Sequence, residues 1–375
     1  MNTFEKLSLK TNPFRLTPTS DDNELVWAGF PDIKEKIERR IKRSIQIPNT
    51  TLVLNWGEYG SGKTHAAKYF SKKSVLRELS GEKNAQPYSI AIDFPKSKEP
   101  VKDIFTQVID RVEIDELRLK IDESELNVHD AINKSTDNLF IRDLLSVIFD
   151  KERDPLRPLV DESTVKSYLY GSSDAKKMLN EGVLRKMSSD SDYTEFLGAL
   201  FSIMTFENKA YSCVIIWIDE FEDISILNNT NISNVNNFIR TIIDKTPNNL
   251  LLFLNLTQST LMSVEDLGEY LQESVKSRIK ERINMQMPNS EELKRYIREL
   301  LNYPTFRYGK ESDNEYAPFE ESVIDAVIND LNGVSLRRYN EAFSLLIENA
   351  AFDGISCINL DYYQKNRSEV IGWKD

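Results

Sequence analysis

The stretch that most constrains this chain is a glycine-rich loop at residues 57–64, which reads GEYGSGKT. It follows an apolar run at 51–56 and leads into a helical pattern that starts at His65. A strand, a glycine turn and a helix with the spacing GxxxxGK[ST] make up a P-loop. Gly60 and Gly62 let the backbone bend, so that successive N–H groups point at phosphate oxygens. The sequence therefore predicts a phosphate-binding loop in an α/β fold.

Two side chains of the loop carry the expected chemistry. Lys63 is expected to reach the β- and γ-phosphates of a nucleotide, and the hydroxyl of Thr64 to hold Mg²⁺. ATP and Mg²⁺ are therefore the expected cofactors. The residues expected to line the nucleotide are Glu58, Tyr59, Gly60, Ser61, Gly62, Lys63, Thr64 and His65.

The composition is that of an ordinary globular protein. The chain has 375 residues, of which 40% are hydrophobic and 29% charged. This length allows a nucleotide-binding core of about 200 residues plus an insertion or a small second domain. No apolar run approaches the ~18 residues of a membrane span, and the start shows no signal-peptide pattern. We expect a cytoplasmic protein without a membrane partner.

Cysteine, histidine and charge exclude several classes of protein. Cys213 and Cys357 are the two cysteines. They give neither a disulfide framework nor a zinc spacing, and Cys213 is expected to be a small buried side chain. With only His65 and His129 present, a histidine-based metal site or catalytic triad is not expected. The net charge of −12 argues against a protein that coats nucleic acid unaided, so any DNA contact is expected to be indirect.

A second chemical signal is the run VIIWIDE at 214–220, which is apolar until it ends in two acids. Such a run is typical of a central parallel strand that is buried on both faces, and ligands bind at the C-terminal ends of these strands. Asp219 is expected to hold Mg²⁺ directly or through water, and Glu220 to polarise the attacking water. Glu222 and Asp223 are expected to face solvent.

The next buried run, at 250–258, also ends in polar residues. A polar side chain at this strand tip could hold the attacking water or the γ-phosphate. The register leaves two candidates open, Asn255 and Thr257. A helix at 270–280 and a short strand at 283–287 are expected to complete the core.

The predicted architecture is an α/β fold, with a parallel sheet flanked by helices, a helical insertion and a C-terminal helical lid. The segment at 114–194 has a less regular helical pattern, which indicates an insertion that offers a partner surface. We expect no separate DNA-binding domain within the tail. The predicted parts are an N-terminal extension at 1–31, a nucleotide-binding core at 32–288 with the insertion at 114–194, a lid at 289–355 and a tail at 356–375.

Together these motifs resemble the AAA+ ATPases over residues 25–355. The tripeptide NPF at 12–14 is similar to the branch that holds origin-recognition ATPases and transposition regulators. The sequences GEYGSGKTH at 57–65, YLYG at 168–171 and IWIDE at 216–220 are similar to ATP-binding proteins of bacterial phage-exclusion (BREX) systems. The resemblance implies the AAA+ form of the P-loop fold and ATPase activity.

The resemblance also implies an arginine finger, which enters the ATP site of a neighbouring subunit. Arg278 lies just before the last core strand, where the family carries this residue, and Arg282 is the second candidate. Thr257 is the better match for the family's sensor-1 position at the tip of the strand.

A sensor-2 arginine is implied at the start of the last lid helix. The family usually places it three residues after a glycine, which here is Gly333. That position holds Leu336, so Arg337 or Arg338 must serve instead.

The implied function is that of an ATP-hydrolysing switch that forms a homo-oligomer and regulates a partner protein, such as a nuclease, in DNA transactions or antiphage defence. The alternative is a nucleotide-dependent binding module that signals by order and disorder with little turnover. A small-molecule kinase fits less well, because the insertion is oversized for a substrate cover and the lid resembles that of AAA+ proteins.

Overall fold

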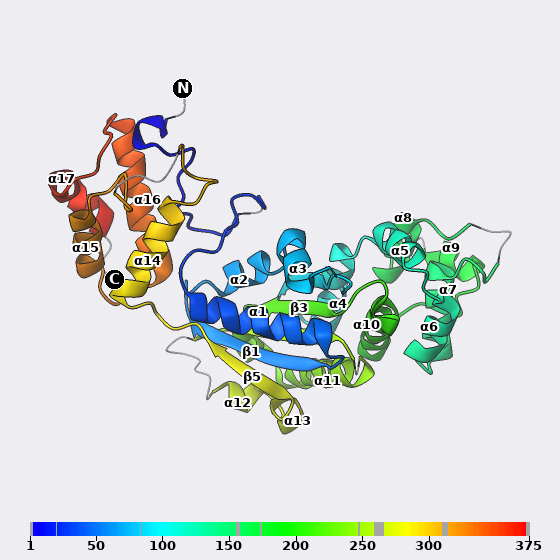
Figure 1. Cartoon of the computed structure of the whole chain (residues 1–375). Coiled ribbons are helices and arrows are strands. Elements are labelled where there is room, and N and C mark those ends of the chain that lie inside the picture. The colour runs from blue at the N-terminus through cyan, green and yellow to red at the C-terminus, as the bar shows by residue number, and fades with distance from the viewer. Residues whose placement is uncertain are drawn as a thin grey trace. The chain divides into compact units, whose positions relative to one another are not determined.

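The computed structural model describes residues 3–19, 21–82, 84–154, 158–172, 175–246, 248–258, 266–309 and 314–372. By their contacts, the residues form two compact units. The first unit consists of Met1–Lys36, Gly57–Lys72 and Asn284–Asp375, and the second of Ile37–Trp56 and Lys73–Ile283. This division differs from the boundaries expected from the sequence, which stay predictions. Figure 1 labels most of the helices and three of the strands, β1, β3 and β5.

A five-stranded sheet has the order β2-β3-β4-β1-β5. Its strands are β1 (Thr51–Glu58), β2 (Tyr88–Asp93), β3 (Val214–Asp219), β4 (Leu250–Gln258) and β5 (Ile279–Asn284). The pairs β2–β3 and β3–β4 are parallel, with Asp93 beside Asp219 and Ile218 beside Leu254. Every residue of β3 is buried, as a strand covered on both faces requires. The predicted parallel α/β fold with flanking helices is confirmed.

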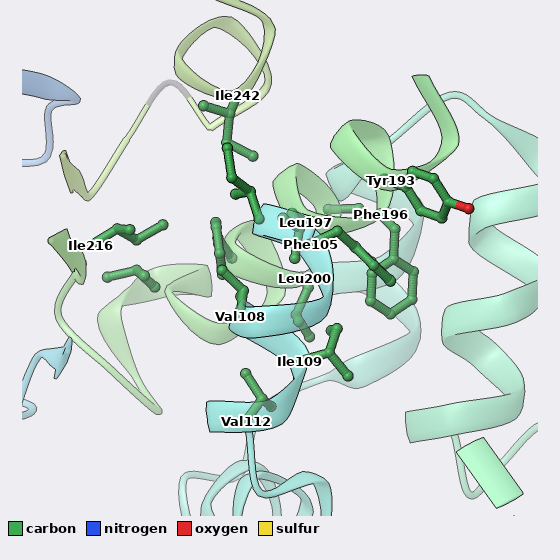
Figure 2. Packing of buried hydrophobic residues seen from close by; sticks show 14 of the residues in the cluster. Phe105, Val108, Ile109, Val112, Tyr193, Phe196, Leu197, Leu200, Ile216 and Ile242 are labelled. Carbon is green, nitrogen blue, oxygen red and sulfur yellow. The ribbon is translucent and has the colours of Figure 1, made fainter. Parts of the chain in front are cut away.

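The helices of the second unit cover this sheet with aliphatic and aromatic side chains. Figure 2 shows side chains of α4 (Pro100–Arg111) packing with those of α10 (Asp190–Met204). Phe105 and Leu200 are examples from these two helices, and both are almost fully buried. Burial of such a side chain contributes about 1.5–3 kcal/mol. Helix α11 (Asn229–Lys245) also packs against α10, so the two halves of this unit share one apolar core.

The other elements of the second unit are short. They are α3 (Lys73–Ser80), α5 (Ile114–Glu123), α6 (Val128–Ser135), α7 (Leu139–Phe149), α8 (Glu162–Leu169), α9 (Ala175–Asn180), η2 (Phe206–Asn208), η3 (Phe221–Ile226), α12 (Leu267–Tyr270) and α13 (Glu273–Lys276). Helix α1 (Pro31–Gln46) begins in the first unit and ends in the second. None of the helices in the described ranges combines the length and the apolar character needed to cross a bilayer.

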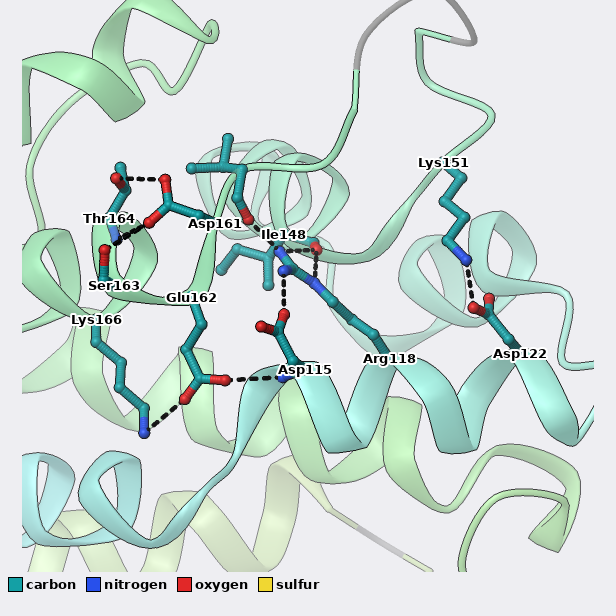
Figure 3. Close-up of polar contacts among 11 residues, drawn as sticks. Asp115, Arg118, Asp122, Ile148, Lys151, Asp161, Glu162, Ser163, Thr164 and Lys166 are labelled. Atoms are coloured by element: carbon teal, nitrogen blue, oxygen red, sulfur yellow. Dashed lines mark hydrogen bonds and ion pairs between the residues drawn. The ribbon is translucent and has the colours of Figure 1, made fainter.

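The predicted insertion is a set of short helices, α5 to α9, held together by polar contacts as well as by apolar packing. Figure 3 shows Arg118 of α5 at the centre of these contacts. Its guanidinium donates to the carbonyl of Ile148 at 2.8 and 2.9 Å, and to that of Val160 at 2.7 Å. Ile148 lies in the last turn of α7, whose carbonyls have no partner within the helix. One arginine thereby connects α5 to the end of α7 and to the segment before α8.

The first unit is built on the C-terminal helices α14 (Ser290–Leu301), α15 (Glu321–Asp330), α16 (Leu336–Phe352) and α17 (Leu360–Ile371), together with η1 (Glu5–Leu7) and α2 (Lys63–Tyr69). The NPF tripeptide anchors the N-terminal segment to α16. Phe14 stacks on Phe343 with ring centroids 5.2 Å apart, and the Asn12 amide donates to the Ser344 hydroxyl at 2.8 Å. The segment at 360–371, within the predicted tail, is a helix whose Tyr363 is fully buried in this core.

Two local predictions were wrong. The helix expected at 270–280 is replaced by the end of α12, the single turn α13 and the start of β5, and the strand expected at 283–287 is β5 at Ile279–Asn284. The Asn236 side chain explains part of the break, because it accepts the Gln272 N–H at 2.8 Å and donates to the Tyr270 carbonyl at 2.8 Å. Pairing of β5 beside β1 accounts for the rest, since tertiary contacts override local propensity.

Candidate functional site

The glycine-rich loop joins the end of β1 to the start of α2 in the first unit. Gly60 and Gly62 have φ values of +76° and +99°, which glycine adopts at little cost and other residues do not. Gly57 is constrained by space, because a Cβ there would lie 2.5 Å from the Met285 carbonyl oxygen. All three glycines of the motif are therefore required by the observed backbone.

Lys63 folds back over this loop. Its Nζ donates to the carbonyls of Gly57 and Glu58 at 2.9 Å each, and to the Ser61 hydroxyl at 3.3 Å. The residue is 5% exposed, and a buried ammonium is costly unless such acceptors surround it. Phosphate oxygens are stronger acceptors for an ammonium than neutral carbonyls are, so this position suits a lysine that binds phosphate.

The other end of the motif is fixed by aromatic packing. His65 donates from Nε2 to the Val26 carbonyl at 2.8 Å. Burial is the main cause that lowers the pKa of His65 below its usual range, and the charges of Lys68 and Lys72 lower it further. The Trp27 ring lies beside His65, with centroids 6.1 Å apart. This packing holds the N-terminal segment against α2.

Of the two candidate sensor-2 residues, Arg337 contacts the loop. Its guanidinium carbon lies 4.4 Å from the centroid of the Tyr59 ring, and it also donates to the Tyr59 hydroxyl. A Cβ on Gly60 would meet the Arg337 Cβ at 3.0 Å, so the backbones are close as well. Arg338 instead donates to Glu341 at 2.6 Å and to the Val370 carbonyl at 3.1 Å. This arrangement favours Arg337.

The second unit carries the predicted acids at the end of β3. Asp219 is 8% exposed, and Glu220 has a φ of +55°. A residue with a side chain in this left-handed region costs about 1–3 kcal/mol, and such strain clusters at functional sites. The carboxylate of Glu220 is exposed and lies 3.3 Å from the ammonium of Lys96.

Lys96 is a residue that the sequence patterns did not identify. It follows β2 and also contacts Asp223 at 2.9 Å. Hydrogen bonds to Asp223 and Glu220 raise the pKa of Lys96. It could be found only with the strand order, which places Asp93 at the end of β2 beside Asp219 at the end of β3.

The expectation that Glu222 and Asp223 face solvent was wrong. Asp223 pairs with Lys96 as described, and Glu222 accepts the backbone N–H of Thr257 at 2.8 Å. The reason is that η3 turns back along the end of β4 after Glu220. Glu222 thus connects the two strand ends.

The structure distinguishes the two candidates at the tip of β4. Asn255 is fully buried and accepts the side-chain amide of Asn55 at 3.0 Å. Thr257 is only half-buried and lies nearer the strand end. A ligand at the edge of the sheet can reach Thr257 more readily than Asn255, which supports Thr257 as the sensor-1 residue.

The two candidate arginine fingers differ in their contacts and in their exposure to solvent. Arg278 donates to both carboxylate oxygens of Asp244, at 2.8 and 3.0 Å, and also to the Ser274 carbonyl. Arg282 is exposed on β5. The first candidate is therefore held by an intramolecular ion pair, and the second projects from an edge strand.

The predicted site residues fall into two groups. The first unit brings Arg337 onto the loop that spans Glu58 to His65. The second unit brings Asp219 and Glu220 to the end of one strand and Thr257 to the end of the next.

The predicted magnesium ligands have suitable chemistry. Thr64 and Asp219 offer a hydroxyl and a carboxylate, the oxygen donors that Mg²⁺ prefers, and one or two protein ligands suffice beside nucleotide phosphates. Among the residues that the structure describes, no group of three or more His, Cys, Asp or Glu side chains is arranged to hold a metal ion.

No known protein-family model matches this sequence. No curated protein matches it either.

Several solved structures match almost the whole chain. The Aeropyrum pernix ORC2 protein in ADPNP–ADP complexes is 14% identical with a TM-score of 0.55, over 96% of this chain and 72% of that one. The Aeropyrum pernix ORC1 protein in complex with DNA is 12% identical with a TM-score of 0.53, over 96% and 70%. Drosophila ORC bound to DNA is 13% identical with a TM-score of 0.51, over 98% and 65%. At these identities the likeness shows the fold alone: this chain shares the fold of these ORC structures.

Proposed function

We propose that this protein is an ATP-binding and ATP-hydrolysing AAA+ switch. The observation that carries the proposal is the loop at 57–64, where two glycines with positive φ bend the backbone under a buried Lys63. Its ammonium donates to the carbonyls of Gly57 and Glu58. Charged phosphate oxygens of a nucleotide would accept stronger hydrogen bonds from it than these carbonyls do.

Each predicted residue has a role in this proposal. The backbone N–H groups from Glu58 to His65 and the ammonium of Lys63 bind the phosphates. Thr64 and Asp219 would hold Mg²⁺, which would neutralise charge on the phosphates. Glu220 takes a proton from the attacking water. Thr257 orients that water or the γ-phosphate, and Arg337 reports the state of the nucleotide to the lid.

We propose that hydrolysis requires a second copy of the chain. Arg278 would enter the ATP site of the neighbouring subunit, where an arginine supplied in trans raises kcat about 10³–10⁵-fold in other nucleotide hydrolases. In the single chain its guanidinium is bound to Asp244, so assembly would have to break this pair.

We also propose that the switch regulates a partner effector, such as a nuclease, in DNA transactions or antiphage defence. The support is the sequence resemblance at 57–65, 168–171 and 216–220 to BREX ATP-binding proteins. Any DNA contact would then be made mainly through the partner. Plating of phage on cells that carry the complete defence locus, with wild-type or Lys63→Ala protein, tests this role. Equal plating would contradict it.

The decisive experiment for the enzyme measures ATP hydrolysis with Mg²⁺ as a function of protein concentration. We expect the rate per subunit to rise with concentration. Glu220→Gln should lower turnover by about 10²–10⁴-fold, the usual contribution of a general base, and leave ATP binding intact. A wild-type rate per subunit that stays flat would contradict the shared site, and unchanged turnover in Glu220→Gln would contradict the role of Glu220.

A nucleotide-dependent binding module with little turnover is the second candidate. Two ion pairs favour it, because Lys96 holds Glu220 and Asp244 holds Arg278. Both residues proposed to act in hydrolysis are thus engaged elsewhere in the single chain. Wild-type protein that binds ATP but does not hydrolyse it at any concentration would support this candidate over the first.

A further inference from the structure

The start of α16 does not place an arginine where the family usually has one. Leu336, at that position, packs against the apolar core of the first unit. Successive residues on a helix point about 100° apart. Arg337 therefore leaves α16 in a different direction, and helix geometry alone does not aim it at the loop.

A side chain of the loop accounts for the observed position of Arg337. The guanidinium carbon lies 4.4 Å from the centroid of the Tyr59 ring, within the range of a cation–π contact. The same guanidinium donates to the Tyr59 hydroxyl. The ring fixes the distance of the guanidinium from Tyr59, and the hydrogen bond to the hydroxyl fixes its orientation.

The backbone around this contact is close as well. A Cβ on Gly60 would lie 3.0 Å from the Arg337 Cβ and 3.1 Å from the Ser335 hydroxyl. The start of α16 thus lies against the turn whose N–H groups are proposed to bind phosphate. Tyr59 remains 65% exposed, so the stability of the core does not explain its contact with Arg337.

We propose that Tyr59 is a positioning residue that holds Arg337 over the phosphate-binding turn, so that the arginine meets the terminal phosphate of a nucleoside triphosphate. This inference rests on the proposed function of the loop. Tyr59 makes up for the one-residue displacement of the arginine along α16. Because an arginine that is already positioned loses less freedom when it binds, it contributes more to affinity.

The proposal predicts discrimination between nucleotides. ADP lacks the terminal phosphate, so its affinity should depend little on Tyr59. ADPNP retains three phosphates and resists hydrolysis, so its affinity should depend on both Tyr59 and Arg337. The ratio of the two affinities therefore reports the position of the arginine, whereas a general loss of folding would weaken both ligands alike.

The test is calorimetry with Mg²⁺ and either ADPNP or ADP, using the full chain. Tyr59→Ala should weaken ADPNP binding about 3- to 10-fold, the range of a partly desolvated cation–π contact, with ADP affinity within about 2-fold of wild type. Tyr59→Phe should keep most of the affinity, because the ring remains. The double variant Tyr59→Ala/Arg337→Ala should be no weaker than Arg337→Ala alone.

Tyr308→Ala is a matched control, because Tyr308 is an exposed tyrosine of the same unit. It should leave both affinities unchanged. Wild-type affinity for ADPNP in Tyr59→Ala, or strictly additive losses in the double variant, would overturn the positioning role. Failure of the wild-type protein to bind either nucleotide would instead contradict the proposed function itself.

Discussion

The loop of the first unit and the acidic strand end of the second differ in how their polar groups are held. Lys63 is held by partners 2, 5 and 6 positions away in the chain. Glu220, Glu222 and Arg278 are held by residues on other elements, namely Lys96, Thr257 and Asp244. These partners of Lys63 all lie within its own loop. These contacts between elements include ion pairs with exposed partners, Lys96 and Asp244, which a single substitution can remove.

The largest effect on kcat is expected for substitution of Arg278, whose ion pair with Asp244 joins two different elements of the fold. Arg278→Ala should lower kcat about 10³-fold or more, because in the proposed function this arginine would offset charge on the transferring phosphoryl group. Arg282→Ala should change kcat only a few-fold. The measurement is steady-state ATPase activity at protein concentrations that allow assembly.

Mixed subunits sharpen this prediction. Lys63→Ala subunits should bind ATP only weakly but still supply Arg278, whereas Arg278→Ala subunits should bind ATP but supply no finger. A mixture of the two inactive variants should recover activity at composite sites. A mixture as inactive as its components would contradict a finger that acts in trans.

The next largest effect is expected for the locally organised loop. Lys63→Ala should weaken ATP affinity about 10–100-fold, because it removes charge-assisted hydrogen bonds to phosphate. Lys68 is a matched control, since it is exposed one turn further along α2. Lys68→Ala should bind ATP within about 2-fold of wild type by calorimetry. Equal losses in the two variants would show that general charge, not the position of Lys63, determines affinity.

A smaller effect on ATP turnover is expected when Lys96 is replaced. Whether turnover rises or falls shows whether Lys96 restrains Glu220 or assists the reaction. Lys96 and Glu220 are both about half exposed, and such pairs contribute only about 0–1 kcal/mol. Lys96→Ala should therefore raise ATP turnover by no more than about 5-fold, because Glu220 no longer has to leave its partner. Lys98→Ala, at a nearby exposed lysine, should have no effect. Lower turnover in Lys96→Ala would mean that Lys96 assists the reaction.

The smallest effect concerns pH and the packing of His65. Burial lowers the pKa of this histidine below its usual range, so the unfolded chain binds its proton more readily than the folded chain does. Its contribution to stability is therefore full above about pH 6.5, the pKa of an unfolded histidine. That contribution is lost as the pH falls through the folded pKa. Denaturation between pH 8 and 5 should show a flatter pH dependence for His65→Gln than for wild type. Identical slopes would contradict burial of a neutral His65.

The same contrast explains what could be predicted from the sequence. The loop is one contiguous motif, so the strand before it and the helix after it were predicted correctly. The phosphate-binding roles of its glycines and its lysine stay predictions. The strand that ends at Asp219 was also predicted, because seven neighbouring residues at 214–220 carry the signal. Lys96 and Glu222 were missed because their partners are on other strands. A single sequence does not give the strand order that brings them together.

The choices between neighbouring residues show the same limit. Asn255 and Thr257 are both polar and lie two residues apart in one strand, so they point to the same face. The two residues differ in how deeply they are buried in the sheet, since Asn255 is buried against Asn55. Arg337 and Arg338 are likewise adjacent in the sequence. They differ in their hydrogen-bond partners, because Arg337 donates to Tyr59 and Arg338 donates to Glu341. Such choices depend on distances that composition and periodicity do not contain.

The amide contact inside the sheet has a consequence for biosynthesis. Asn55 of β1 and Asn255 of β4 meet 200 positions apart in the chain, and β1 has its place between β4 and β5. A ribosome adds about 5–20 residues per second, so some 10–40 s separate the synthesis of these two strands. Contacts between such distant segments also form slowly. Strand β1 is thus synthesised well before its sheet neighbour β4, and its amide contact can form only after β4 has been translated.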